Sequence, residues 1–261
     1  MTKNIIKLIR EGFSSLFNNL IVLLPFLFQS VLVVLIISFG LFLFLKMFNV
    51  TFLDLVLGKI SQEQLQELFV SALPSSAMSF KIFFIFLVTF LASLLVSSYF
   101  VPGAIGMMYS FFKSNKKPTL KDMHNYGKKF FWRYFFLVLI IDIFFFIVAF
   151  LAFLPVLFSS SSPWSLILFM IIFIILVIFY LFFILAPFIL IVKDCFVFQA
   201  IKKSFSLTKS NFWVFLGLAA LYILLSGLIQ TIPYAGSILS AFVINPAINF
   251  SFVLFSVERS G

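Results

Sequence analysis

The chain has 261 residues, of which 64% are apolar and only 10% are charged, and its formal net charge is +10. A soluble globular protein carries about 25% charged residues, and a core of this size cannot bury so large an apolar excess. Lipid must therefore be the solvent for most of the chain, and we expect an all-α polytopic membrane protein. The single cysteine, Cys195, excludes an internal disulfide and a cysteine-based metal cluster.

The chain begins with a basic amphipathic stretch that is not itself a span. Between residues 2 and 19, isoleucine, leucine and phenylalanine recur at helical spacing, while Lys7 and Arg10 occupy the other face. Such a pattern is typical of a helix that lies in the membrane interface, with its cations directed to anionic lipid. Similar stretches precede residues 134 and 214. We expect lipid-headgroup contacts from Lys7, Arg10, Lys128, Lys129, Lys202, Lys203 and Lys209.

Six apolar runs are long enough to cross a membrane, because about 20 apolar residues span the hydrocarbon core. They cover residues 20–45, 80–112, 134–156, 164–192, 214–232 and 237–257 of what we treat as a single membrane domain, residues 1–261. Between the first two runs, Ser61 and Gln64 predict a capping box that opens a short helix ending near Leu73. After the second run, Thr119 and Asp122 indicate another helix start.

The distribution of positive charge predicts the orientation of the chain. Of the 18 lysines and arginines, all but Lys46, Lys59 and Lys81 lie on one side of the membrane in this arrangement. An excess of lysine and arginine in short loops marks the cytoplasmic side. We therefore expect a multi-pass protein of the plasma membrane with both termini in the cytoplasm. The basic balance serves topology and lipid contact, so we expect no nucleic-acid partner.

An internal repeat relates the three basic stretches. Aligning the first with the third pairs Phe13 with Phe205, Arg10 with Lys202, Ser14 with Ser206 and Asn19 with Asn211. In the middle copy, Lys121 falls opposite Lys202, and Phe131-Trp132 falls opposite Phe212-Trp213. The predicted unit is an amphipathic helix and a two-span hairpin, covering about residues 1–112, 113–192 and 193–261. The alternative is that basic cytoplasmic ends and scattered prolines, which are general features of membrane proteins, produce the likeness.

Asp142 is the one ionisable residue deep within a predicted span. It lies roughly 14 Å past the start of that span, near the middle of a hydrocarbon slab about 30 Å thick. Two interpretations stay open: a proton relay or cation site facing a cavity, or a structural carboxyl that joins helices. No second acid, histidine or arginine within a span completes a relay. The candidate partners in other spans are Gln29, Gln230 and Tyr222.

Prolines recur in the later part of the even-numbered spans, at Pro102, Pro187 and Pro246. Helix breaks at corresponding places in repeats can mark a transporter site, although prolines are also tolerated by neighbouring membrane helices. The sequence has no nucleophile–histidine–acid arrangement, metal-ligand cluster or glycine-rich phosphate loop. We therefore expect no enzyme activity, no metal and no cofactor.

Two functional classes fit these features. The first is a non-catalytic membrane module that binds lipid or a partner protein through its basic interfacial helices. The second is a small transporter or channel with a site near Asp142 and the proline-broken spans.

Two segments carry a resemblance to a known family: APFILIVKDCFVFQAIKKSFSLTKSNFWVFLGL, residues 186–218, and VPGAIGMMYSFFKSNKKPTLKDM, residues 101–123. Both are similar to an uncharacterised prokaryotic membrane-protein family. Its relatives include the membrane domain fused to some glycerophosphodiester phosphodiesterases. The resemblance implies a six-span domain of unassigned biochemical role. It does not imply phosphodiesterase activity, because that chemistry belongs to a separate soluble barrel with several histidines, and this chain has one histidine.

Overall fold

A computed structural model describes residues 5–48, 50–51, 61, 63–64, 66–67, 76–114, 117–158, 163–231, 236 and 240–258. Within these residues the chain is helical and contains no strand, which confirms the predicted all-α class. The elements are α1 (Ile5–Asn18), the 3₁₀ turn η1 (Leu20–Val22), α2 (Leu23–Met47), α5 (Ser76–Ser114), α6 (Leu120–Phe158), α7 (Pro163–Phe183), α8 (Ala186–Val192), α9 (Val197–Ser210), α10 (Phe212–Gln230), the π-helical turn η2 (Ser240–Ile244) and α12 (Asn245–Glu258).

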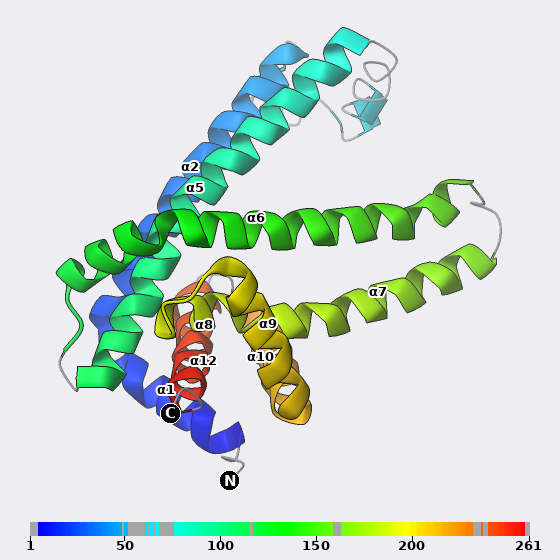
Figure 1. Cartoon of the computed structure of the whole chain (residues 1–261). Coiled ribbons are helices and arrows are strands. Elements are labelled where there is room, and N and C mark those ends of the chain that lie inside the picture. Colours follow the sequence, from blue (N-terminus) through cyan, green and yellow to red (C-terminus); the bar gives the residue numbers. More distant parts are fainter. Residues whose placement is uncertain are drawn as a thin grey trace. The chain divides into compact units, whose positions relative to one another are not determined.

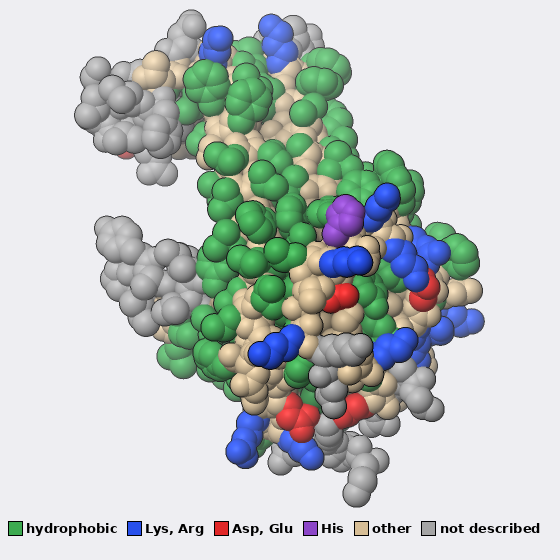
Figure 2. All heavy atoms as spheres, turned by 90° about the vertical axis from the view of Figure 1, so that its left-hand side faces the viewer, with side chains coloured by type: hydrophobic (Ala, Val, Ile, Leu, Met, Phe, Trp, Pro, Cys, Tyr) green, Lys and Arg blue, Asp and Glu red, His purple; other side chains and the backbone are tan. Residues whose placement is uncertain are grey.

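The predicted set of six membrane spans is confirmed. Among the described residues, six helical stretches are long and apolar enough to cross a membrane: Leu20–Met47, Met78–Ser114, Leu120–Leu151, Met170–Val192, Phe212–Gln230 and Ser240–Glu258. Their outward faces carry large apolar side chains, such as Val34 on α2, Phe146 on α6 and Met170 on α7, each at least 60% exposed (Figure 2). Soluble monomers rarely expose apolar surface on this scale, so the chain is a multi-pass membrane protein.

Two predicted helix starts are confirmed by their capping hydrogen bonds. The Ser61 backbone N–H donates to Gln64 Oε1 at 2.9 Å, and the Gln64 N–H donates to Ser61 Oγ at 3.2 Å. At the start of α6, Thr119 Oγ1 donates to Asp122 Oδ2 at 2.7 Å, and the Asp122 N–H donates back to Thr119 Oγ1 at 3.3 Å. The predicted end of the first of these helices, near Leu73, lies outside the described residues.

The basic stretch before the third span is not a separate helix. α6 joins this stretch and the span in one helix of 39 residues. At 1.5 Å rise per residue, α6 is about 58 Å long, or roughly twice the thickness of the hydrocarbon core. Its N-terminal part is therefore long enough to extend beyond the hydrocarbon.

The chain divides into two compact units, residues 1–27 with 98–261, and residues 28–97. The smaller unit is a hairpin of α2 and the first part of α5. Its two helices are joined where Gln29 Nε2 donates to Ser97 Oγ at 3.1 Å. They also meet where Gly40 lies so close to the Thr89 side chain that a Cβ on Gly40 would not fit.

The core of the larger unit is built around two short helices, α8 and α12. α12 is buried along most of its length and contacts α1, α8 and η2 (Figure 1). α8 buries five of its seven residues. Both helices have a proline in the first turn, Pro187 and Pro246. A proline costs least there, because a first-turn N–H has no partner within the helix.

The predicted helix breaks have different outcomes. The fourth span is divided near Pro187, since α7 ends at Phe183 and α8 begins at Ala186. Pro246 follows directly on the irregular turn η2. The prediction is wrong at Pro102, because α5 continues through it as one helix from Ser76 to Ser114.

Close packing accounts for the unbroken helix at Pro102. Gly103 and Gly106, on the next turn of α5, lie against Met123 and Tyr126 of α6 with no space for a Cβ. Neighbouring helices can hold a membrane helix together after a proline has removed one of its hydrogen bonds. The two glycines allow α6 to approach closely enough to do this.

Candidate functional site

The basic helix α1 packs on α12 along a buried face that has Gly12 at its centre. Leu8, Gly12 and Leu16 are buried, whereas Ile6 and Phe17 are more than 60% exposed. A Cβ on Gly12 would lie 2.5 Å from the carbonyl oxygen of Ala247 and closer still to Ser251 Oγ. Ser251 Oγ donates to the carbonyl oxygen of Leu8 at 3.1 Å. α1 is thus fixed to the core, while Ile6 and Phe17 stay exposed on its outer side.

The basic helix α9 is held in the same way. Its buried residues are Ala200, Ser204 and Thr208. Ser204 Oγ donates to the carbonyl oxygen of Phe182 on α7 at 2.5 Å, and the Phe205 ring stacks on the Phe182 ring at 5.1 Å. Small residues therefore bring α9 close to α7, and its lysines lie on the opposite side.

Residues of α1 and α9 that are paired in the sequence alignment are also alike in their burial. Leu8, Gly12 and Leu16 of α1 align with Ala200, Ser204 and Thr208 of α9, and all six residues are buried. The repeat itself stays a prediction.

Aligned positions on the outer face also agree, and they form what we call the basic stripes. Each stripe is a set of exposed residues at the same sequence spacing: Arg10, Ser14, Phe17 and Ile21; Lys121, Asn125, Lys128 and Trp132; Lys202, Ser206, Lys209 and Trp213. The second stripe lies on α6 alone, whereas the last residue of the first stripe is in η1 and that of the third is on α10. All twelve residues are exposed, and Trp132 and Trp213 are 62% and 77% exposed. Figure 2 shows many of the basic side chains gathered on one face, next to apolar ones. In the second and third stripes, two cations are followed by a tryptophan.

Asparagines end the first and third basic helices with matching hydrogen bonds. Asn19 Nδ2 donates to the carbonyl oxygen four residues earlier, Ser15, at 2.9 Å. Asn211 Nδ2 donates to Leu207, also four residues earlier, at 3.0 Å. Each asparagine carbonyl accepts from the N–H three residues later. The corresponding residue of the middle copy is Phe130, which has no amide, and there α6 continues without a break.

All seven predicted lipid-headgroup residues are exposed, but two of them are also engaged within the protein. Lys7 Nζ lies 3.9 Å from Glu11. Lys129 Nζ lies 2.6 Å from Asp194 Oδ2, and Arg133 donates to the same carboxylate at 2.7 Å. Of the predicted set, Arg10, Lys128, Lys202, Lys203 and Lys209 are therefore the cations best placed to contact lipid.

Asp194 has a role that was not predicted from the sequence: it joins the turn after α8 to α6. Its φ of +44° is a left-handed conformation that few residues other than glycine, asparagine and aspartate tolerate. The Cys195 N–H donates to the carbonyl oxygen of Leu190 at 3.3 Å, which closes the helix end. The hydrogen bond from Lys129, together with that from Arg133, holds the pKa of the Asp194 carboxyl below its ordinary value. The sequence signal for this role was an acidic residue directly after the end of a helix that has no glycine to cap it.

The surroundings of Asp142 differ in part from those predicted. Asp142 is half-buried on α6 and interacts electrostatically with Tyr134 and with Tyr180 of α7. Tyr180 in turn interacts with the predicted partner Tyr222 of α10. The structure therefore places a tyrosine of α6 and one of α7 near this carboxyl, and Tyr222 next to Tyr180.

The two predicted glutamine partners have other surroundings. Gln29 belongs to the α2–α5 unit, where its amide donates to Ser97. Gln230 is exposed at the end of α10. In the part of the chain that the structure describes, no group of three or more histidine, cysteine or acidic residues could hold a metal ion.

These features define a class: a helical membrane protein with six spans, whose basic amphipathic helices are packed onto its core. No protein-family model matches the chain, and neither does any curated protein or solved structure.

Proposed function

We propose that the protein is a non-catalytic membrane module that binds anionic lipid headgroups at the cytoplasmic surface through its basic stripes. The observation that carries this proposal is the exposure of two cations and a tryptophan at the same sequence spacing in the second and third stripes. Lysine can bury its methylene stem in lipid while its ammonium reaches a phosphate, and tryptophan prefers the headgroup level of a bilayer. The cations and the tryptophan of a stripe are therefore suited to the phosphate and headgroup levels of one leaflet.

The positions of the charges favour lipid over a protein partner as the main ligand. Each lysine near an anionic bilayer surface contributes about 1 kcal/mol of attraction, and three stripes at one level would add such contributions. In this proposal both termini lie in the cytoplasm of a plasma-membrane protein, because the positive residues gather on that side. A membrane protein with acidic interfacial groups is the alternative partner.

The relation to the membrane domain found beside glycerophosphodiester phosphodiesterases is likewise a proposal. It rests on residues 101–123 and 186–218, which include the close α5–α6 crossing and the third stripe. It would make this chain a lipid-associated membrane domain without a catalytic barrel.

A second candidate function, transport, is favoured by one observation. Asp142 and the tyrosines near it lie in the same unit as the interrupted helices at Pro187 and η2. Transport requires a water-filled path to Asp142, so a cysteine placed at position 142 in a Cys195→Ala background would react with a water-soluble maleimide. Full protection of that cysteine would refute transport.

Tryptophan quenching by brominated lipids tests the lipid proposal at the third stripe. With Trp132 and Trp164 replaced by phenylalanine, Trp213 reports on the lipids beside Lys209. In mixed vesicles, brominated phosphatidylglycerol should quench Trp213 more strongly than brominated phosphatidylcholine, by up to about fivefold for each adjacent lysine. The preference should fall in 0.5 M salt, because salt screens exposed charges.

A matched pair of variants makes this test specific. Lys202→Gln with Lys209→Gln should abolish the preference at Trp213, whereas Lys46→Gln with Lys81→Gln removes the same charge elsewhere and should leave it unchanged. Equal quenching by both lipids in the parent protein would overturn the proposal. Protection of Trp213 from both lipids would favour a protein partner.

A further inference from the structure

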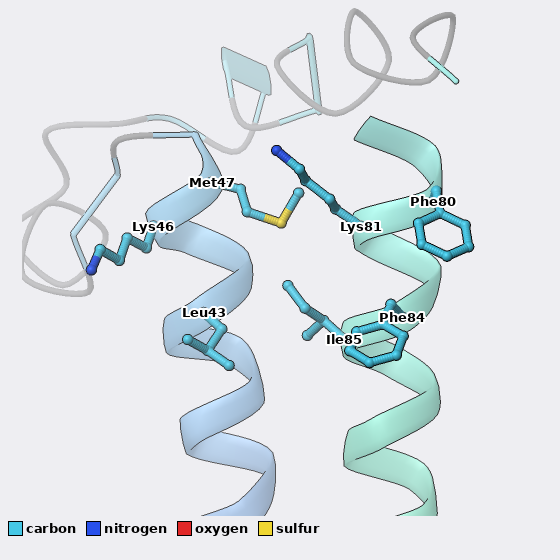
Figure 3. Close-up of a pocket in the computed structure, with 7 residues that line it drawn as sticks. All are labelled: Leu43, Lys46, Met47, Phe80, Lys81, Phe84 and Ile85. Carbon is cyan, nitrogen blue, oxygen red and sulfur yellow. The ribbon is translucent and has the colours of Figure 1, made fainter. Parts of the chain in front are cut away.

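The end of the α2–α5 hairpin opens into an apolar groove (Figure 3). The groove has a volume of about 410 Å³ and is lined by apolar side chains of both helices, among them Leu43 and Met47 of α2 and Phe80, Phe84 and Ile85 of α5. Two lysines, Lys46 and Lys81, complete its lining. All of these residues belong to the smaller unit, whereas the basic stripes belong to the larger one.

The sequence explains why the groove opens at this level. The two helices are in close contact at Gly40 and Thr89, where there is no space for a Cβ. One turn further on, the Phe44 and Phe86 rings meet with their centroids 6.0 Å apart. Beyond this ring contact the facing residues are long or aromatic, so the helices cannot approach as closely and a space is left between them. The groove is thus a consequence of the order of small and large residues along the hairpin.

The lining of the groove has an apolar part and a positively charged part. Its walls present hydrocarbon and aromatic carbon, and its cations lie only at the helix ends. In Figure 3 the Lys81 side chain extends from α5 toward Met47, while Lys46 lies at the outer edge of α2. Both lysines are exposed, and a lysine stem is long and flexible enough for its ammonium group to turn toward an anion at the end of the groove. An apolar channel with cations at one end complements an amphiphile that carries a negative head.

We propose that this groove is a binding site for one anionic phospholipid, with an acyl chain between α2 and α5 and the phosphate near Lys46 and Lys81. The walls are already in a lipid-facing part of the molecule, since Phe80 and Phe84 are 68% and 54% exposed. Lys46 and Lys81 are two of the three cations on the predicted outer side, where positive residues are disfavoured. A bound anionic headgroup gives a physical reason for their presence.

This site is distinct from the basic stripes of the proposed function. It uses other residues, lies in the other unit, and belongs to the end of the hairpin predicted to face away from the cytoplasm. Either proposal can fail while the other holds.

The test places a tryptophan inside the groove and another just outside it. In the full chain with Trp132, Trp164 and Trp213 replaced by phenylalanine, one variant carries Phe84→Trp, in the groove lining, and the control carries Phe83→Trp. Phe83 neighbours Phe84 on α5 and is exposed, but it does not line the groove. Both proteins are reconstituted into mixed vesicles, and quenching by brominated phosphatidylglycerol is compared with quenching by brominated phosphatidylcholine.

The proposal expects a preference for the anionic lipid at position 84 that exceeds that at position 83 by about fivefold or more, from two nearby lysines. Adding Lys46→Gln and Lys81→Gln to Phe84→Trp should bring the two positions to the same ratio. Lys202→Gln with Lys209→Gln should not change the ratio at position 84, which separates this site from the stripes.

Two results would overturn the proposal. Equal ratios at positions 83 and 84 would mean that the groove holds only bulk lipid. Protection of the tryptophan at position 84 from both brominated lipids would mean that protein, either this chain or a second copy, covers the groove. A native mass spectrum of the unsubstituted protein adds a readout free of tryptophan changes: one retained phosphatidylglycerol is expected, and its persistence after Lys46→Gln with Lys81→Gln would contradict the site.

Discussion

The contact between α1 and α12 leads to a sharp prediction about Gly12. In Gly12→Ala the new methyl group would lie 2.5 Å from the carbonyl oxygen of Ala247 and even nearer to Ser251 Oγ. The carbonyl belongs to the backbone of a buried helix and cannot turn aside, so α1 must move away. That movement would also stretch the hydrogen bond from Ser251 to Leu8.

The expected cost follows from the behaviour of overpacked cores. Inserting a methyl group into such a contact destabilises a protein by about 1–3 kcal/mol. At roughly 2–4 °C per kcal/mol for a chain of this size, the melting temperature should fall by about 2–12 °C. Gly227→Ala is the matched control, because a Cβ on Gly227 meets nothing within 4 Å. Alanine is the better helix former, so this control should melt at or above the parent temperature.

The protein contains its own reporter for this assay. Cys195 is the single cysteine and is only 5% exposed, and burial raises the pKa of its thiol. A maleimide dye that fluoresces on reaction should therefore label it only as the protein unfolds in detergent. Equal melting temperatures for Gly12→Ala and Gly227→Ala would refute the close α1–α12 contact.

Three further predictions concern charged residues. Asp194→Asn keeps a residue that tolerates positive φ but removes the charge, so it should reduce the stability by about 1 kcal/mol or less at this half-exposed site. Because the folded-state pKa of Asp194 is lowered, the contribution of its charge to stability is complete above the ordinary pKa near 3.8 and is lost as pH falls through the lower folded value. Melting curves of both proteins between pH 3 and 7 would detect this loss, and a pH-independent difference between them would contradict it. Substituting glutamate for all three of Lys202, Lys203 and Lys209 should reduce insertion into the membrane or association with its surface, measured by protease protection and yield. Normal topology with normal yield would contradict this prediction. Asp142→Asn should assemble normally and leave any proton-coupled flux unchanged if the carboxyl is structural, whereas loss of such flux would support a relay.

The parts of the fold that sequence predicted are those determined by local pattern. Long apolar runs identified the spans, because lipid-facing helices must be apolar throughout. The capping pairs of Ser61 with Gln64 and of Thr119 with Asp122 were found because their partners are three residues apart. The alignment of Asn19 with Asn211 marked the two positions where a basic helix ends before a span.

The parts that sequence did not predict depend on residues far apart in the chain. Ser251 reaches Leu8 across 243 positions, and Asp194 reaches Arg133 across 61. Only folding brings these groups together, and no periodicity indicates them. Pro102 failed as a break for the same reason, since the glycine contacts with α6 override its local effect. The groove between α2 and α5 was likewise invisible, because it depends on which residues of two helices face each other.

The depth of Trp132 and Trp213 in the bilayer shows whether the basic stripes lie among lipid headgroups. Two variants each keep one of these tryptophans, with Trp164 and the other one replaced by phenylalanine. Each is measured against lipids brominated at successive acyl positions and against aqueous iodide. If the basic stripes lie among lipid headgroups, quenching should be strongest for bromines nearest the headgroup, at the same shallow depth for both residues. Strong quenching by iodide with none by brominated lipid would place the stripes in water and contradict the account.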